Sequence, residues 1–478
     1  MPHFQQHTYT TVTEQRGVKR LWLQGLRLRQ CGFDKGERYR VDYDMDSGLL
    51  HLVADKNGDR VVSGRKRGND VDPIVDVCNA SVVAFAGDVT RVRADFIAGR
   101  ITFSISHLER NRIERETRFR RELAEGTLTE GTVCSGISMA TDALHEGLRS
   151  MGVKSSVSWV VDRERRYLEV AARNSQAVTD ATQLFEASLE ELEPELLSPV
   201  SILQASLPCT GHSPAGKTKN KIKLAEEHKT DATAVFGFMN VIQAVSPAIC
   251  VSENVRQARN SASYIMIKSM LELLDYTVNE IDLGPEQSGS IESRRRYWFV
   301  AVSKGLSQVD LSTVSCFQPS YRNIGELLEP LADDHPSWSE NRYLKAKQKR
   351  DAAEGKGFAK RSLLTQESPS MGVAPRTYQK RQSSSPMLTR PDGKERLFTP
   401  IELCRAHSAP ESLIEGLVDA VAYEGLGQAI DYRQGIGIGM CIARDCCSAQ
   451  SPTNLTVLAA KSSHTTEGHD EDQLSLFG

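Results

Sequence analysis

Hydrophobic and polar residues alternate along the first hundred positions in a way that predicts paired β-strands. Arg38–Tyr43 and Leu49–Val53 flank one short turn, and Arg91–Phe96 and Arg100–Ile105 flank another. Alternation with period two on both sides of a glycine-containing turn is typical of a β-hairpin. Two such hairpins in succession predict a small β domain over residues 1–106.

A charged helix is predicted next, over residues 107–126. Its arginines recur at three-residue spacing and so share one side of the helix. They are Arg112, Arg115, Arg118 and Arg121. Two interpretations are open: the stripe faces DNA, or the helix is an exposed basic linker whose arginines pair with glutamates.

Apolar strands and amphipathic helices then alternate over residues 127–302. The predicted strands are Val157–Val161, Val200–Leu203, Ala248–Val251 and Tyr297–Val302, with helices around Val235–Val245 and Tyr264–Leu274. This alternation predicts an α/β fold with a doubly wound, mostly parallel sheet. Ligands of such sheets bind beyond the carboxyl ends of the strands.

Periodicity fades over residues 303–395, where serine, proline, lysine and arginine are frequent, and returns over 396–445. The formal net charge of the chain is −3, yet residues 342–361 and Lys380-Arg381 are basic. Such a segment suits contact with phosphates, because neutralising DNA releases counterions. A solvated basic loop is the other interpretation. Residues 446–478 read as a flexible polar tail.

The ten cysteines are scattered and form no Cys-x-x-Cys pair. This usage is typical of a reducing cytoplasm, where each cysteine is a small buried apolar residue. Cys441, Cys446 and Cys447 lie close together but lack a histidine partner at useful spacing, so no metal site is expected. Neither a long apolar run nor a signal-peptide pattern is present, and we expect a cytoplasmic protein.

Four reactive side chains lie at or near predicted strand ends. Cys209 follows one strand in a loop rich in glycine and proline, where a thiolate would be accessible. Glu253 ends the next apolar strand and is a candidate acid. Arg294 and Arg296, two residues apart beside a strand, share a face and suit a phosphate or a carbonyl oxygen.

These motifs, in this order, resemble the DNA cytosine-5 methyltransferase family from about Thr132 to Ala443. The family's Pro-Cys-Gln-Gly-Phe-Ser-x-Ala-Gly-Lys loop is similar to Pro208–Lys217, with Thr210 and His212 in place of glutamine and phenylalanine. The remaining matches are Glu253-Asn254-Val255, Glu292–Arg296 for Gln-x-Arg-x-Arg, Leu397–Glu402 for Leu-Thr-Pro-x-Glu, and Gly427–Ile430 for Gly-Asn-Ala-Val.

The resemblance implies a Rossmann-like S-adenosylmethionine-dependent methyltransferase domain and a covalent mechanism on a flipped cytosine. Cys209 would add to C6 of the base. Glu253 would hold N3 and the amino group, and Arg296 the base carbonyl. Arg294 would support the loop or bind a phosphate.

The cofactor implied by the resemblance is S-adenosyl-L-methionine. The residues that would line its site are Cys134, Ser135, Gly136, Asp162, Pro208 and Gln428. One of the three glycines in the family's Gly-x-Gly-Gly stretch survives, as Gly136. Asp162 would hold the ribose hydroxyls, and Ser188 stands where the family has an aspartate near the adenine.

Residues 303–395 fall where the family inserts its target-recognition domain, which reads base edges in double-stranded DNA; a disordered linker is the other interpretation. Val18–Val41 resembles the small swapped-hairpin β domains of SymE and AbrB type. DNA binding, dimerisation and a purely structural role are open for it. Gln473–Phe477 resembles the peptide that inserts into the bacterial sliding clamp.

The sequence therefore predicts a DNA cytosine-5 methyltransferase, with the catalytic domain formed by residues 127–302 and 396–445. Two alternatives stay open. The eroded glycine stretch and the N-terminal domain would fit a catalytically inactive DNA-binding regulator. One branch of the family acts on RNA, which makes an RNA cytosine methyltransferase the second alternative.

Overall fold

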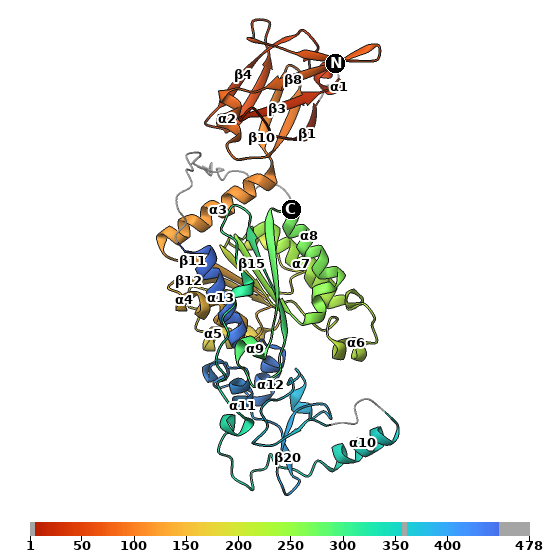
Figure 1. Cartoon of the computed structure of the whole chain (residues 1–478), viewed down its shortest axis with the longest axis vertical. Coiled ribbons are helices and arrows are strands. Elements are labelled where there is room, and N and C mark those ends of the chain that lie inside the picture. The colour runs from red at the N-terminus through yellow and green to blue at the C-terminus, as the bar shows by residue number, and fades with distance from the viewer. Residues whose placement is uncertain (1–4, 356–360, 449–478) are drawn as a thin grey trace, which may run out of the picture. The chain divides into compact units, whose positions relative to one another are not determined.

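The computed structural model describes residues 5–355 and 361–448, so the predicted clamp-binding peptide Gln473–Phe477 lies outside the described residues. The chain divides into two compact units, and the division falls after Arg110, within helix α3 (Figure 1). Among the described helices, none is both long enough and apolar enough to span a lipid bilayer.

The first unit is built mainly of antiparallel strands. Its strands are β1 (Gln5–Thr11), β2 (Thr13–Gln15), β3 (Val18–Gln24), β4 (Arg38–Asp44), β5 (Leu49–Ala54), β6 (Arg60–Val61), β7 (Ser63–Arg67), β8 (Asp70–Val77), β9 (Arg91–Ile97) and β10 (Arg100–Ile105), with helices α1 (Leu26–Gln30) and α2 (Ala80–Ala86). They form one sheet of order β1-β9-β10-β5-β4-β6 and one of order β2-β3-β8-β7.

Both predicted hairpins are confirmed, as the antiparallel pairs β4–β5 and β9–β10. Their alternation has the expected cause: Val92, Ala94 and Phe96 of β9 point into the core, while the residues between them are more exposed. The resemblance of residues 18–41 to swapped-hairpin domains stays a prediction.

The second unit contains the remaining elements. These are α3 (His107–Glu125), which crosses the division, β11 (Leu128–Val133), α4 (Met139–Ser150), β12 (Ser155–Asp162), α5 (Arg165–Asn174), β13 (Gln183–Glu186), β14 (Ile202–Ala205), α6 (Pro214–Asn220), α7 (Lys229–Val245), β15 (Ile249–Asn254), α8 (Ala262–Leu273), β16 (Tyr276–Leu283), α9 (Pro285–Ser288), β17 (Arg296–Ser303), α10 (Arg342–Ala353), β18 (Leu363–Leu364), β19 (Met387–Thr389), β20 (Glu395–Arg396), α11 (Pro400–Ala406), α12 (Asp419–Gln428) and α13 (Tyr432–Cys446). Short 3-10 helices are η1 (Pro194–Leu196), η2 (Ala225–Glu227), η3 (Arg256–Asn260), η4 (Leu311–Thr313), η5 (Ile324–Leu327), η6 (Tyr378–Lys380) and η7 (Glu411–Ile414).

A seven-stranded sheet of order β13-β12-β11-β14-β15-β17-β16 organises this unit. The five strands from β13 to β15 are parallel, and β17 pairs antiparallel with both β15 and β16. Every residue of β14, β15 and β17 is buried, as expected for strands covered on both faces. The predicted α/β fold with a mostly parallel sheet is confirmed.

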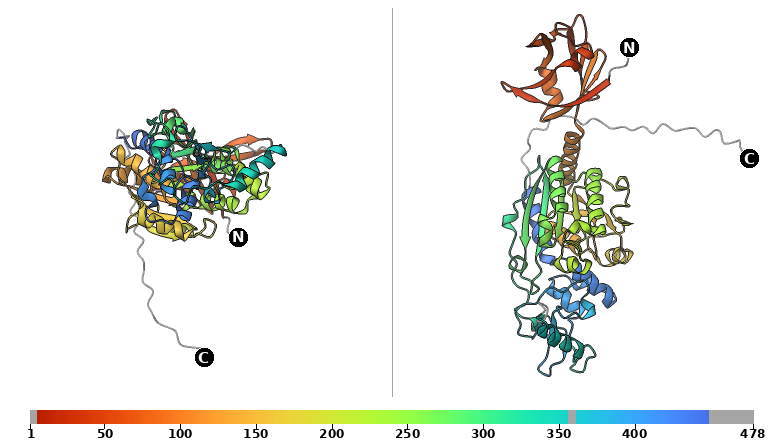
Figure 2. Two further views of the ribbon diagram at one scale, coloured as in Figure 1. Left: turned by 90° about the horizontal axis from the view of Figure 1, so that it is seen from below. Right: turned by 90° about the vertical axis from the view of Figure 1, so that its right-hand side faces the viewer.

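Helices cover the two faces of this sheet (Figures 1 and 2). Val300 and Val302 of β17 belong to the same apolar cluster as residues of α4 and α13, whereas Phe299 and Ala301 pack with residues of α7 and α8. The close crossing of α4 and α13 depends on Gly147, where an added Cβ would lie 2.3 Å from the Ile436 carbonyl oxygen.

The arginine stripe on α3 is divided: Arg121 is exposed and pairs with Glu125, as the linker interpretation expected, whereas Arg115 and Arg118 point into the protein. Arg115 is 2% exposed; its Nε donates to Ser303 Oγ at 2.9 Å, and its guanidinium lies over the Tyr276 ring. Arg118 donates to the carbonyl oxygens of Val200 and Ser246. These side chains serve as donors for carbonyls at the end of the sheet opposite to the predicted site, and that corrects both interpretations for these two residues.

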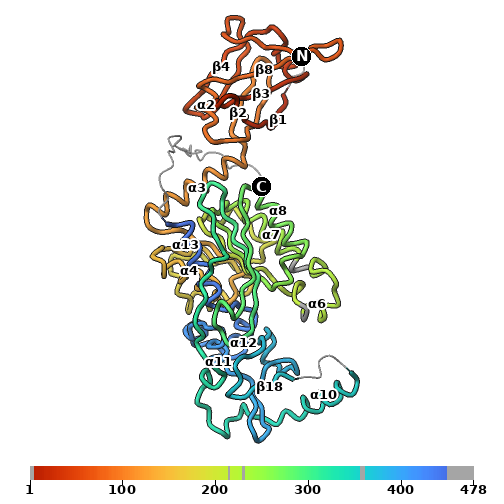
Figure 3. Tube along the Cα trace, in the orientation of Figure 1, coloured from red at the N-terminus to blue at the C-terminus, as the bar shows by residue number. Residues whose placement is uncertain are grey.

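Within residues 303–355 and 361–395 the chain is folded, with α10 and a three-stranded sheet of order β18-β19-β20 (Figure 3). One predicted phosphate-binding residue is internal: Arg361 is buried and pairs with Glu395 at 2.6 Å. Arg342, Lys349 and Arg350 of α10 are exposed. The basic character of this stretch is therefore divided between internal ion pairs and the exposed side of one helix.

Asp142, in the first turn of α4, makes folding depend on pH. It accepts hydrogen bonds from Ser175 Oγ and from the backbone N–H groups of Gln176 and Ala177. Burial raises the pKa of its carboxyl from 3.8 to about 6. Because the folded state favours the protonated form, this carboxyl adds to the free energy of unfolding. Its contribution is complete below about pH 4 and is lost as pH rises through about 6.

We therefore expect the Asp142→Asn variant to lack this dependence of the free energy of unfolding on pH. Between pH 4 and pH 8 the wild-type free energy of unfolding should fall, relative to that of the variant, by about 2–3 kcal/mol. Urea unfolding at several pH values measures the difference. Parallel profiles for the two proteins would contradict the assignment.

Candidate active site at the carboxyl edge of the sheet

Cys209, Glu253 and Arg296 are brought to one edge of the sheet by strand direction. Strands β14 and β15 are parallel neighbours, so the loop that carries Cys209 and the end of β15 with Glu253 emerge at the same edge. Strand β17 runs antiparallel to β15, and the register pairs Asn254 with Tyr297. Arg296, the first residue of β17, therefore lies beside the end of β15.

The buried side chains of Glu253 and Arg296 lie side by side, with Arg296 Nε 3.4 Å from Glu253 Oε2. Within the described chain, that carboxylate oxygen has no hydrogen-bond partner. Burial raises the pKa of Glu253, and Arg296 opposes the shift only in part. A buried carboxyl with an unfilled hydrogen-bonding position and a raised pKa is suited to hold a polar heterocycle and to keep a proton.

Asn254 holds the reactive loop in place, a role that the sequence did not reveal. Its Nδ2 donates to the Leu207 carbonyl oxygen and to Tyr264 Oη, each at 3.0 Å. Leu207 lies two residues before Cys209, so this amide ties the end of β15 to the start of the cysteine loop. The Glu-Asn-Val motif was a signal for Asn254, whereas nothing in the pattern marked Tyr264.

The loop after Cys209 is a tight turn into α6. The Cys209 carbonyl oxygen accepts hydrogen bonds from the N–H groups of His212 and Ser213, at 3.1 and 2.9 Å. Gly216 has no room for a side chain, because an added Cβ would lie 1.8 Å from the Thr210 carbonyl oxygen. The glycine of this motif is therefore needed for close backbone approach around the cysteine.

His212 occupies a position that suits an apolar ring. It is buried, its ring lies edge-on to Tyr264 at 5.7 Å between centroids, and burial lowers its pKa. In the described part of the chain, its Nδ1 atom has no hydrogen-bond partner. An unsatisfied buried nitrogen costs free energy that an apolar ring of similar shape avoids.

We therefore expect His212→Phe to stabilise the protein by about 1 kcal/mol. Thermal unfolding of the full chain should show a raised midpoint, with methyl transfer unchanged within about twofold. His51→Phe, at a half-buried histidine whose Nδ1 hydrogen-bonds with Thr102 Oγ1 at 3.0 Å, is the control and should give no gain. A lowered midpoint for His212→Phe would show that the ring nitrogens serve the loop.

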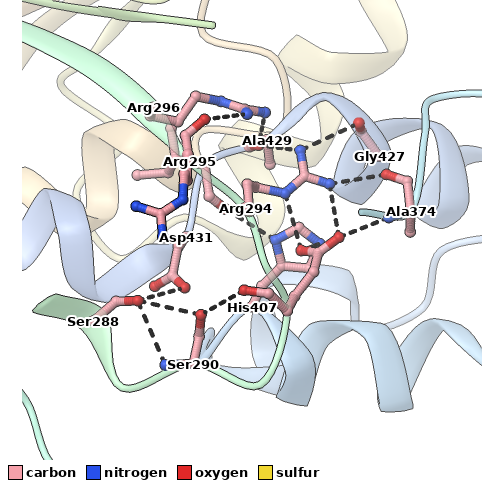
Figure 4. Close-up of polar contacts among 12 residues, drawn as sticks. Ser288, Ser290, Arg294, Arg295, Arg296, Ala374, His407, Gly427, Ala429 and Asp431 are labelled. Carbon is pink, nitrogen blue, oxygen red and sulfur yellow. Dashed lines mark hydrogen bonds and ion pairs between the residues drawn. The ribbon is translucent and has the colours of Figure 1, made fainter. Parts of the chain in front are cut away.

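Arg294 is fully buried, and all of its donors are used within the protein (Figure 4). Its Nε and Nη2 pair with Glu292 at 2.9 and 3.2 Å. Nη1 donates to the carbonyl oxygens of Gly427 and Ala429, and Nη2 also donates to that of Ala374. A guanidinium has five donors, so none is left for a phosphate, and support of the surrounding loops is the role that the contacts favour.

The predicted cofactor residues lie at the same edge, after neighbouring strands. Cys134, Ser135 and Gly136 follow β11, and Asp162 ends β12. The N–H of Gly136 donates to Asp162 Oδ2 at 2.9 Å, and the N–H of Glu164 donates to Oδ1 at 2.9 Å. Each oxygen keeps a further lone pair for a hydroxyl group. Burial raises the pKa of Asp162.

The other predicted cofactor residues reach this region from separate elements. Pro208 follows β14, and Gln428 ends α12 and donates through Nε2 to Tyr167 Oη of α5. Ser188 instead donates to Glu191 Oε2 at 2.7 Å. Two residues with left-handed backbone, Cys134 and Ser138 (φ 54° and 61°), shape the turn where the family has more glycine.

Comparison with known proteins agrees with this geometry. The C-5 cytosine-specific DNA methylase family matches residues 142–433. The fold is similar to that of S. pombe Dnmt2 methyltransferase, with 17% identity over 66% of this chain and 99% of that chain and a TM-score of 0.52. It is also similar to the Entamoeba histolytica methyltransferase EhMeth, with 15% identity, 65% and 96% coverage and a TM-score of 0.51.

Identities this low show a shared fold and nothing finer. None of the curated proteins matches the sequence. The family match itself covers more than half of the 478 residues, from within α4 to the start of α13, and includes Cys209, Glu253 and Arg296. The chain therefore belongs to the C-5 cytosine-specific DNA methylase family.

Proposed function

We propose that this protein transfers a methyl group from S-adenosyl-L-methionine to C5 of a cytosine in double-stranded DNA, through a covalent adduct at Cys209. The observation that carries the proposal is the convergence of Cys209, Glu253 and Arg296 at one edge of the sheet. A nucleophile, a buried acid and a cation in one place are what addition to an electron-poor ring requires.

The reaction begins with a flipped base, since C6 cannot be reached inside a duplex. The Cys209 thiolate forms a bond to C6, and electron density moves toward C5 and N3. Glu253 donates a hydrogen bond to N3 from its protonated carboxyl, for which its raised pKa is suited. Arg296, beside Glu253, holds the base carbonyl oxygen.

The adduct is then resolved. Bound S-adenosylmethionine supplies an electrophilic methyl group for C5. A water molecule takes the C5 proton, the C5–H electron pair forms the C5–C6 double bond, and the sulfur–C6 bond breaks, which restores the aromatic ring and releases Cys209 as a thiolate. Splitting one hard substitution into addition and elimination lowers the barrier of each step.

Asp162, Cys134, Ser135, Gly136, Pro208 and Gln428 are proposed to line the methyl-donor site. The donor set fits: the Asp162 oxygens each keep a lone pair that would accept from the ribose hydroxyls, and Gly136 has no side chain that would separate its backbone from the ligand. Methyltransferases of this family use the same donor, which supports the assignment.

Residues 303–395 are proposed to bind the target duplex. Arg342, Lys349 and Arg350 lie on the exposed side of α10 beside Tyr343, which is 70% exposed. A basic helix face with an aromatic residue is suited to phosphates. A folded recognition region of this size favours DNA over RNA as the substrate. The intact Cys209, Glu253 and Arg296 argue against an inactive regulator.

Bisulfite sequencing of DNA from cells that express the wild-type chain or Cys209→Ala tests the proposal. We expect methylated cytosines in one short sequence context, present with the wild type and absent with the variant. Transfer to duplex DNA and to RNA should be compared with the purified protein. No methylation by a folded wild-type protein would contradict the proposal, and preferential labelling of RNA would reassign the substrate.

A further inference from the structure

The Arg294 contacts join two segments that are far apart in the sequence. We call Met371–Ala374, which lies within residues 303–395, the recognition segment, and Gly427–Ile430, which contains Gln428, the cofactor segment. The cofactor segment packs against the residue that follows the recognition segment: an added Cβ on Gly427 would lie 2.5 Å from the Pro375 carbonyl oxygen. Arg294 donates to Ala374 in one and to Ala429 in the other, at 2.9 Å each (Figure 4).

Glu292 fixes the orientation of that guanidinium. Its side chain is 0% exposed, and it receives two hydrogen bonds from Arg294. Its Oε1 also accepts the backbone N–H of Ala374 at 2.7 Å. One carboxylate therefore holds the recognition segment directly and, through Arg294, the cofactor segment as well.

His407, at the end of α11, completes the cluster. Its Nδ1 donates to the Ile430 carbonyl oxygen at 2.9 Å. Its Nε2 lies 3.2 Å from Glu292 Oε2 without a hydrogen bond between them, since burial lowers the pKa of the ring to about 4. The charged groups around Glu292 are Arg294 and, farther along the cluster, Arg296 and Asp431. The cofactor segment is thus held from three sides, by Arg294, Arg296 and His407.

We propose that Glu292 is a positioning residue that makes the recognition and cofactor segments one rigid unit, with Arg294 as the link, while His407 anchors the cofactor segment through Ile430. The inference rests on the proposed function, in which one segment serves the DNA and the other the methyl donor. Since both segments depend on one carboxylate, loosening it changes the binding of both ligands together.

Glu292→Asp is the sharpest test, because it keeps the negative charge beside Arg294 and withdraws the carboxylate by one methylene. The shorter side chain cannot reach both the guanidinium fork and the Ala374 N–H. Hydrogen exchange of the full chain, without ligand, should increase in the peptides that contain residues 371–374 and 427–430. Exchange in β9 and β10 of the first unit should stay unchanged.

Binding provides the second readout. The Kd for S-adenosylhomocysteine and the KM for duplex DNA should both rise about tenfold to 100-fold in Glu292→Asp, with a smaller change in kcat. Glu286→Asp is the matched control, because Glu286 forms an exposed pair with Arg295 in the same connection. It should leave both values unchanged.

The outcomes separate the two proposals. If exchange rises in only one segment, or if only the melting temperature changes, Glu292 is a structural residue and the inference is wrong. If exchange rises in both segments but the wild type binds neither ligand, the coupling stands and the proposed function fails. Arg294→Lys, which keeps the charge but not the fork, should reproduce the Glu292→Asp exchange pattern.

Discussion

Replacing Cys209 by alanine is expected to lower methyl transfer to DNA by at least about 10⁴-fold, because no other group can form the bond to C6. Cys209 is partly exposed and lies near Arg296 of the Glu253–Arg296 pair, whereas burial raises the pKa of Cys134, a second thiol at that edge, and disfavours its thiolate. Transfer of labelled methyl groups under single-turnover conditions measures the loss. Binding of S-adenosylhomocysteine should change little, since most of the residues proposed to contact the methyl donor lie after β11 and at the end of β12.

A covalent trap gives the same prediction a direct readout. In a duplex with 5-fluorocytosine at the target position, C5 has no proton to lose, so the adduct cannot be resolved. The wild type should therefore form a complex that survives denaturing electrophoresis, and Cys209→Ala should not. Cys316→Ala, at another accessible cysteine, is the control and should trap normally. A persistent adduct in Cys209→Ala would assign the nucleophile elsewhere.

The second large effect is expected from Glu253→Gln, which should lower kcat by about 10²–10³-fold. The amide keeps the shape of the side chain but cannot hold the proton that stabilises negative charge at N3. Burial raises the pKa of the wild-type carboxyl. Activity that needs the protonated form is present below that raised pKa and declines as pH rises through it.

The pH profile separates this role from a merely structural one. The loss of activity as pH rises through the pKa of Glu253 should be present in the wild type and absent in Glu253→Gln. Glu169→Gln, at an exposed carboxylate paired with Arg165, should keep the wild-type profile. Equal kcat values for Glu253→Gln and the wild type would remove the carboxyl from the mechanism.

Much of the catalytic unit was predictable because its signals are local. Uniformly apolar runs marked the buried strands of a parallel sheet, and a cysteine, a glutamate and an arginine stood at the ends of three of them. Parallel strands end at the same edge, so order along the chain was enough to predict that Cys209 and Glu253 converge. The antiparallel placement of β17 then brought Arg296 beside them.

The sequence pattern did not predict where the arginine side chains of α3 point. The arginine stripe of α3 reads as a solvated or DNA-binding face, because arginine is charged and long. In the structure, Arg115 and Arg118 donate hydrogen bonds to carbonyl and hydroxyl acceptors that lie 82 to 188 residues away in sequence. Only the folded sheet end presents those acceptors, so no local periodicity could have identified their partners.

The sequence by itself determined the α/β order, the hairpins and the candidate reactive residues, since each depends on neighbours within a few positions. Tertiary structure alone decided the Glu292–Arg294–His407 cluster, whose members meet only when residues 292, 374, 407 and 429 are brought together. The reason is physical: periodicity reports which residues are buried, whereas a buried charge persists only where distant backbone groups supply its hydrogen bonds.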